Sequence, residues 1–260
     1  MLSKLQIRTI TSLHHKKFRR EHGLFIVEGI KSVMEFVHSD YIVQHVFYTA
    51  QAAAKFVKIP QNIKSDEISE QELIRISSLK APQGVLALVA IPSYPALRSN
   101  ALSGDFTLVL DDIQDPGNLG TIIRTAEWFG FKRVVCSAGT VDTYNPKVVQ
   151  ASMGSLARME IHYTDIAELI AHTPLPVFGA VLEGMPIYET DFGHEGLIIL
   201  GNEGSGINAA ILPHLKHRVT IPRVGRAESL NVAVSAALFC AELARKRNRE
   251  GDNSPVSTDL

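Results

Sequence analysis

Cysteine is scarce in this chain, whose 260 residues include only Cys136 and Cys240. Both lie in apolar stretches and form neither a disulfide framework nor a metal-binding spacing, so we expect buried, reduced thiols. No segment approaches the ~18 consecutive apolar residues that a membrane span requires. The N-terminal residues also lack the apolar core of a secretory signal. These absences predict a cytoplasmic protein that does not enter a membrane.

Several catalytic patterns are missing as well. The histidines form no metal-ligand spacing, and no metal is expected. Ser205 lies in Gly-Ser-Gly and not in the Gly-x-Ser-x-Gly turn that presents a hydrolase nucleophile. Asp111 and Asp112 are adjacent at a predicted turn, where carboxylates more often cap a helix or face water. The sequence therefore disfavours metalloenzymes and serine hydrolases.

The net charge of −1 gives no general affinity for nucleic acid, but the basic residues are unevenly distributed. Residues 1–20 contain no acidic side chain and a cluster of basic ones, namely Lys4, Arg8, Lys16, Lys17, Arg19 and Arg20. Such a cluster binds phosphates by releasing counterions. A solvated, partly helical arm is the alternative, and composition alone leaves both interpretations open.

Alternating helix and strand patterns predict two α/β domains joined by a linker. In residues 1–94 the apolar runs predict strands at 24–27, 42–48 and 85–91, and helices at 50–57, 68–74 and from residue 30. Ser69 and Glu72 match a capping box at the start of one of these helices. Residues 95–105 carry Pro, Ser, Asn and Gly without periodicity, as linkers do.

The second domain is expected at residues 106–247. Its predicted strands are 106–110, 133–136, 177–181, 197–200 and 218–221, and its clearest helices are 119–129 and 232–245. Strands that alternate with helices predict a mainly parallel sheet covered on both faces. The polar tail at 248–260 has the composition of a disordered segment.

Three loops of this second domain carry unusual polar residues. The first, Asp115-Pro-Gly-Asn-Leu-Gly120, opens a helix on which Arg124 projects away from the apolar stripe. The second, Leu200-Gly-Asn-Glu-Gly-Ser-Gly206, is a glycine-rich loop after a buried strand. Its glycine order is neither that of a dinucleotide fold nor that of a Walker loop, and a tight turn has no need of Glu203.

The third loop, Ile221-Pro-Arg-Val-Gly-Arg-Ala-Glu-Ser-Leu-Asn231, leads into a long apolar helix. Ser229 or Asn231 would be a natural N-cap there. In order and spacing, however, the three loops resemble the signature motifs of the SpoU (TrmH-type) branch of the SPOUT RNA methyltransferases. Residues 16–29 likewise resemble the substrate-binding domain of that family.

The resemblance implies S-adenosylmethionine-dependent methylation of ribose 2′-hydroxyls in rRNA or tRNA, with a slight preference for rRNA. It implies a C-terminal SPOUT-type parallel sheet with a deep trefoil knot, a smaller N-terminal α/β RNA-binding domain, and a homodimer formed through the first and last catalytic-domain helices. The implied catalytic residues are Arg124, Asn118, Glu203, Ser229 and Asn231. The implied cofactor-binding residues are Gly201, Asn202, Gly206, Ile221 and Leu230, and the implied RNA-binding residues are Lys16, Lys17, Arg19 and Arg20.

The role of Arg124 has three interpretations. The family proposal is that this arginine activates the 2′-hydroxyl, but a guanidinium holds its proton strongly. Stabilisation of a developing alkoxide, or binding of the neighbouring phosphate, is at least as reasonable. Two other functions remain as alternatives, a non-catalytic RNA-binding scaffold and a nicotinamide-dependent oxidoreductase. The glycine order disfavours the oxidoreductase, and the intact polar residues of the three loops disfavour the scaffold.

Overall fold

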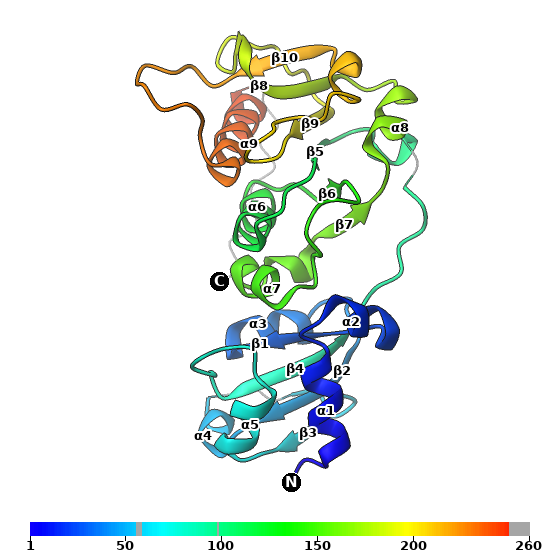
Figure 1. Ribbon diagram of the computed structural model, residues 1–260, viewed down its shortest axis with the longest axis vertical. Helices are drawn as coiled ribbons and strands as arrows, with labels where there is room; N and C mark the ends of the chain where they lie inside the picture. The colour runs from blue at the N-terminus through cyan, green and yellow to red at the C-terminus, as the bar shows by residue number, and fades with distance from the viewer. Residues whose placement is uncertain (56–58, 98, 250–260) are drawn as a thin grey trace. The chain divides into compact units, whose positions relative to one another are not determined.

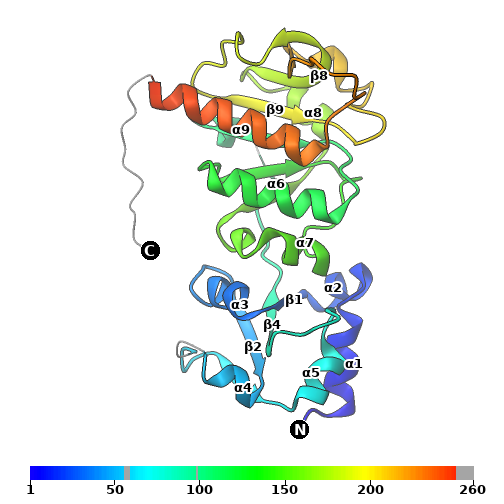
Figure 2. The same cartoon turned by 90° about the vertical axis from the view of Figure 1, so that its left-hand side faces the viewer.

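The computed structural model describes residues 1–55, 59–97 and 99–249. Its internal contacts divide the chain into two compact units. The first unit comprises residues 1–96, 114–124 and 141–160, and the second comprises residues 97–113, 125–140 and the chain from 161 onward. Figures 1 and 2 show the elements of both units in two views. The tail predicted to be disordered lies outside the described residues from position 250 on.

The first unit is built on a four-stranded sheet in the order β1-β4-β2-β3. Its strands are β1 (Leu24–Glu28), β2 (Val43–Tyr48), β3 (Lys64–Glu67) and β4 (Val85–Ala90). Strand β4 runs antiparallel to both β1 and β2, whereas β2 and β3 are parallel. The strands that the apolar runs predict are confirmed, and β3 is an addition.

Helices cover this sheet and extend the first unit. They are α1 (Lys4–Ser12), α2 (Lys16–His22), α3 (Ile30–Val37), α4 (Ala50–Ala53), α5 (Glu70–Ile76) and α7 (Pro146–Ser152), with the 3-10 turn η2 (Ser155–Arg158). The predicted capping box is confirmed, since Ser69 accepts the Glu72 N–H and Glu72 accepts the Ser69 N–H. The helix predicted at 50–57 is shorter than expected, and its positions 56–58 lie outside the described residues.

The second unit contains a six-stranded sheet in the order β10-β8-β9-β5-β6-β7. Its strands are β5 (Phe106–Leu110), β6 (Arg133–Cys136), β7 (Glu160–Tyr163), β8 (Val177–Pro186), β9 (Gly196–Leu200) and β10 (His217–Thr220). The β10–β8, β8–β9, β9–β5 and β5–β6 pairings are all parallel. The mainly parallel sheet predicted from the alternating pattern is therefore confirmed.

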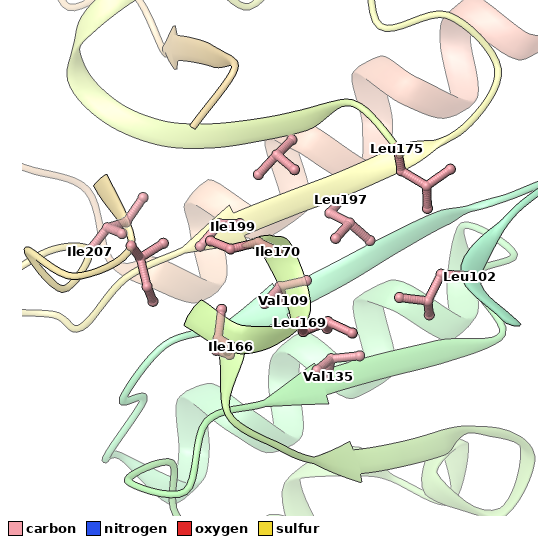
Figure 3. Packing of buried hydrophobic residues seen from close by; sticks show 12 residues of the cluster. Leu102, Val109, Val135, Ile166, Leu169, Ile170, Leu175, Leu197, Ile199 and Ile207 are labelled. Atoms are coloured by element: carbon pink, nitrogen blue, oxygen red, sulfur yellow. The ribbon is translucent and has the colours of Figure 1, made fainter. Parts of the chain in front are cut away.

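The remaining helices are α6 (Pro116–Trp128), α8 (Ile166–Ala171) and α9 (Val232–Arg249), with the 3-10 turns η1 (Ser99–Leu102) and η3 (Leu212–His214). Figure 3 shows one core of the second unit, in which Val109, Val135 and Ile199 of the central strands pack against α8. Leu102, within the predicted linker, is fully buried in the same core. The linker residues therefore end in a packed turn before β5 begins.

The two cysteines are buried, as predicted. Within residues 1–55, 59–97 and 99–249, none of the helices combines the length and the hydropathy that crossing a membrane would need. The same residues hold no group of three or more potential metal ligands.

Candidate functional site

The strand order brings three loops to one edge of the parallel sheet. Strands β9, β5 and β6 are neighbours and run in the same direction, so their carboxyl ends lie side by side. The loops that follow begin at Gly201, Asp111 and Ser137. Open parallel sheets bind their ligands at this kind of edge.

Side chains of the loop after β6 hold the turn that follows β5. The Asp112 N–H donates to Ser137 Oγ at 2.8 Å, and the Ile113 N–H donates to Thr140 Oγ1 at 3.3 Å. The Thr140 hydroxyl in turn donates to the Leu110 carbonyl at 3.1 Å. Two hydroxyl residues thus satisfy the main chain of the turn that leads towards α6. Sequence reasoning did not single out either residue, although both lie in the short loop that follows a predicted strand.

Asp112 occupies a conformation that non-glycine residues rarely adopt, with φ at 58°. Such backbone strain persists only where surrounding contacts enforce it, and it clusters at functional sites. The enforcing contact comes from the glycine-rich loop, because Asn202 Nδ2 donates to the Asp112 carbonyl at 2.8 Å. The turn after β5 and the loop after β9 are therefore joined.

Asp111 makes a second link between the same two segments. Its Oδ2 accepts the Asn208 N–H at 2.8 Å, and its side chain is buried. Burial raises the pKa of this carboxyl, and the neighbouring charge of Asp112 acts in the same direction. Asp111 and Asp112 line a cavity of about 580 Å³ together with Ser137, Thr164, Ser205 and Gly206. Of the residues predicted to bind the cofactor, only Gly206 lines this cavity.

The glycine-rich loop is closed by its own main chain. The N–H of Asn202 donates to the Gly206 carbonyl at 2.9 Å, and the N–H of Gly206 donates back at 3.0 Å. The Asn202 Oδ1 accepts the N–H groups of Gly204 and Ser205 at 2.8 and 3.1 Å. The Asn202 side chain is therefore engaged at both ends within the protein. It shapes the loop, and the binding of the cofactor by Asn202 stays a prediction.

An Asn202→Ala variant is expected to lower the free energy of unfolding by about 1–3 kcal/mol. The change leaves the Asp112 carbonyl and two loop N–H groups without their partner. Urea denaturation measures the difference. A Ser205→Ala variant is the control, because the main-chain bond of Ser205 survives and its side chain is exposed. Equal stability of the two variants would contradict the role given to Asn202.

The third predicted loop is largely exposed from Pro222 to Asn231, whereas Ile221 is half-buried. Asn231 is the N-cap of α9, since its Oδ1 accepts the Ala233 N–H at 2.8 Å. The capping interpretation is thus confirmed for Asn231. Ser229 is exposed, and Leu230 presents about half of its surface, with 49% exposed.

The first predicted motif belongs to the first unit and opens α6. Asp115 Oδ1 accepts the Asn118 N–H at 2.8 Å, which fixes the first turn of the helix. Arg124 is exposed, as its angular position away from Leu119 predicts, whereas Leu119 is buried. The residues from Gly201 to Asn231 belong to the second unit. The first motif and the other two motifs therefore lie in different units.

The predicted RNA-binding residues divide into two kinds. Lys16, Lys17 and Arg20 are exposed on α2, whereas Arg19 is only 2% exposed. Arg19 forms an ion pair with Asp142 at 2.5 Å. The expectation that Arg19 contacts RNA is therefore corrected, because a buried guanidinium that is paired with a carboxylate is not available to bind phosphates.

Comparisons with known proteins agree with this geometry. Residues 105–241 match the sequence model of the SpoU rRNA Methylase family, and residues 4–87 match that of the MRM3-like substrate binding domain. The chain is 30% identical over 246 residues to the 23S rRNA (guanosine(2553)-2′-O)-methyltransferase RlmP of Bacillus subtilis, covering 92% of this chain and 95% of that protein.

Solved structures are similar as well. A Porphyromonas gingivalis protein assigned to the TrmH family of RNA methyltransferases is 37% identical, with a TM-score of 0.85 over 95% of this chain and 99% of that one. An AdoMet-bound rRNA methyltransferase from Sinorhizobium meliloti is 27% identical, with a TM-score of 0.82 over 95% and 97% of the two chains. The match to the family model covers more than half of the sequence, and so this chain belongs to the SpoU rRNA Methylase family.

Proposed function

We propose that this protein transfers the methyl group of S-adenosylmethionine to a ribose 2′-hydroxyl of ribosomal RNA. A carbon–oxygen bond forms, the carbon–sulfur bond breaks, and the hydroxyl proton is released. One observation carries the proposal, in a chain that belongs to the SpoU family. The Asn202 side chain joins the loop after β9 to the turn after β5, at the carboxyl edge of the parallel sheet. The named activity of the RlmP relative supports rRNA as the substrate class.

The residues of the second unit fit the cofactor. Half-exposed Leu230 and half-buried Ile221 offer apolar cover for a purine ring. Gly201 lets the loop close on its own main chain at Gly206 and Ile207, whereas nothing lies within 4 Å of where a Cβ of Gly206 would be, so a ligand can approach the main chain there. When bound, S-adenosylmethionine supplies an electrophilic methyl group on a sulfonium, and the AdoMet-bound relative from Sinorhizobium meliloti supports this choice.

The catalytic roles proposed for the protein rest on its polar side chains. Asn118, Glu203, Ser229 and Asn231 are proposed to orient the ribose and its phosphate for in-line attack. Arg124 is proposed to stabilise the alkoxide that develops when the hydroxyl loses its proton, a role that suits a permanent cation. Positioning alone accounts for up to ~7–11 kcal/mol of barrier reduction in well-oriented reactions.

The exposed basic face of α2 is proposed to bind the RNA backbone. Lys16, Lys17 and Arg20 are all solvent-exposed, and the matched substrate-binding domain includes them. We place this domain at residues 1–94, the methyltransferase domain at 106–247 and the protein in the cytoplasm. The trefoil knot stays a prediction of the family resemblance.

The test of the function is a comparison of methyl transfer to rRNA and to tRNA. Both RNAs are prepared from a strain that lacks the protein, and each is incubated with the purified chain and labelled S-adenosylmethionine. The expected result is one methylated ribose that is absent from the strain and restored in the reaction. Transfer to tRNA alone would contradict the proposed substrate, and transfer to neither RNA would contradict the proposed activity.

A homodimer through α6 and α9 is also proposed. Trp128 on α6 is 79% exposed and Val234 on α9 is 48% exposed, and such large apolar side chains are candidates for burial in an interface. The opposite face of α9 is buried in the second unit through Ala236, Phe239 and Leu243.

A Val234→Glu variant is expected to be monomeric at concentrations at which the unmodified chain is dimeric. A carboxylate in an apolar interface would lose its hydration without gaining a partner. Sedimentation velocity measures the mass, and fluorescence of Trp128, the sole tryptophan, should shift to the red on dissociation. Leu5→Glu is the control, because Leu5 is an exposed apolar residue on α1. An unmodified chain that sediments as a monomer would contradict the proposal.

A further inference from the structure

One cation of the basic helix α2 points inward. Arg19 donates from Nε and Nη2 to Asp142 Oδ2 at 3.0 and 2.5 Å, and from Nη1 to the carbonyls of Leu13 and His14 at 2.9 and 3.0 Å. Its hydrogen bonds join α2 to a residue far along the chain, and both partners belong to the first unit. A guanidinium whose N–H groups donate to several acceptors is held in one orientation.

The partner of Arg19 begins the segment that leads into α7. Asp142 Oδ1 accepts the Tyr144 N–H at 3.3 Å, and the Asp142 carbonyl accepts the Asn145 N–H at 2.9 Å. Asn145 then caps α7 by accepting the Lys147 N–H at 2.9 Å. The position of Arg19 is thus transmitted to the first turn of α7.

Helix α7 packs closely against the helix that carries the first family motif. Gly120 of α6 is buried, and a Cβ at this position would lie 2.5 Å from the Ala151 Cβ and 2.6 Å from the Val148 carbonyl oxygen. Only the methyl group of Ala151 lies between the two backbones there, so a shift of α7 would displace α6. Asn118 and Arg124 lie on this same part of α6, within the first unit.

Other contacts hold the same segment to the first sheet and its helices. The ring of Phe25 on β1 lies 4.6 Å from that of Tyr144, centroid to centroid. Glu35 on α3 forms an ion pair with Arg158, and both side chains remain partly exposed. Helix α7 lies beside the region of α2 and α3 in both views (Figures 1 and 2).

We propose that Arg19 is a positioning residue for methyl transfer. By fixing α2 to Asp142 and thereby to α7, it sets where RNA bound by Lys16, Lys17 and Arg20 lies relative to Asn118 and Arg124. The inference rests on the proposed function, since it assumes that α2 binds RNA and that α6 carries catalytic residues. Because replacing a whole buried ion pair often costs no stability, the role assigned to this pair is to fix the arrangement of the two helices.

Three variants test this role: Asp142→Asn, Arg19→Met, and the two combined. Each variant is expected to lower kcat at saturating RNA by on the order of 10- to 100-fold, because small misplacements of reacting groups have effects of this size. The double variant should lose no more than the larger of the single losses, since the partners act as one unit. Affinity for S-adenosylmethionine and for RNA should stay within about 3-fold of the unmodified chain. Arg19→Lys should restore part of the rate, because lysine keeps the charge.

The measurements use full-length chain and ribosomal RNA that lacks the modification. Lys132→Met is the control. It removes an ion pair with Asp105, in which the Lys132 side chain is 72% exposed. If Arg19 contacts RNA instead, Arg19→Met will weaken RNA binding and reduce the salt slope by about 1, while Asp142→Asn will not. If the pair is only structural, melting temperatures will fall while kcat on folded protein is unchanged. Either result overturns the inference, and Asp142→Asn decides the question should Arg19→Met fail to fold.

A distance measurement separates this inference from the proposed function. Spin labels are placed at Lys17→Cys on α2 and Thr121→Cys on α6, both exposed positions of the first unit, while the native cysteines are buried. The inference predicts that Asp142→Asn broadens the distance distribution between the labels. An unchanged distribution overturns it. Absence of methyl transfer by the unmodified chain would instead contradict the proposed function.

Discussion

An Arg124→Ala variant is expected to lose at least about 100-fold in kcat while its affinity for S-adenosylmethionine stays close to that of the unmodified chain. Loss of one preorganised donor to a developing oxyanion has an effect of this size. Arg124 is exposed on α6 and is proposed to act on the ribose oxygen and not on the cofactor, so cofactor affinity should survive. Single-turnover kinetics with rRNA and calorimetry with the cofactor give the two quantities.

Two further substitutions sharpen the interpretation of this result. Arg124→Lys keeps a positive charge without the planar fork, so it should retain more activity than alanine if charge stabilisation dominates. Lys132→Ala removes another exposed cation, which lies in the second unit, and should leave kcat unchanged. Near-native turnover by Arg124→Ala would exclude this arginine from the reaction.

The parts of the fold that local sequence could predict are those in which neighbouring residues decide the outcome. All five residues of β5 are buried, and the sequence predicts this with a run after a linker that is apolar except for Thr107. Strand β3 was not foreseen, because Lys64–Glu67 is polar and mostly exposed. Its strand conformation comes from parallel pairing with β2 rather than from its own residues.

The same distinction holds for the candidate site. The exposure of Arg124 follows from helical periodicity, and the cap at Asn231 follows from its place before an apolar helix. The inward orientation of Arg19 and the engagement of Asn202 depend on partners 123 and 90 residues away in the sequence. No local pattern distinguishes Arg19 from its exposed neighbour Arg20, so the sequence predicted one role for both. Helix α7, only seven residues long, is also not predicted from the sequence, although it connects the Arg19–Asp142 pair to α6.

A Gly201→Ala variant is expected to weaken S-adenosylmethionine binding by at least about 100-fold. The added Cβ would lie 2.2 Å from the Gly206 carbonyl carbon and 2.3 Å from the Ile207 nitrogen. Both are main-chain atoms, so no side-chain rotation can relieve the clash. The loop would have to open, which would break the paired main-chain bonds between Asn202 and Gly206. A ligand that relies on close approach to this main chain would then lose its contacts.

The control lies in the same loop. A Cβ at Gly204 would meet nothing nearer than Asn202 Oδ1 at 3.6 Å, an ordinary contact distance. Gly204→Ala should therefore bind the cofactor within about 3-fold of the unmodified chain, since a methyl group at an uncrowded loop position changes energies by only about 0.5 kcal/mol. Calorimetry on both variants, with circular dichroism to verify folding, gives the comparison. If the two alanines have equal effects, crowding at Gly201 does not shape the cofactor site; if only Gly201→Ala loses affinity, the closed loop is part of that site.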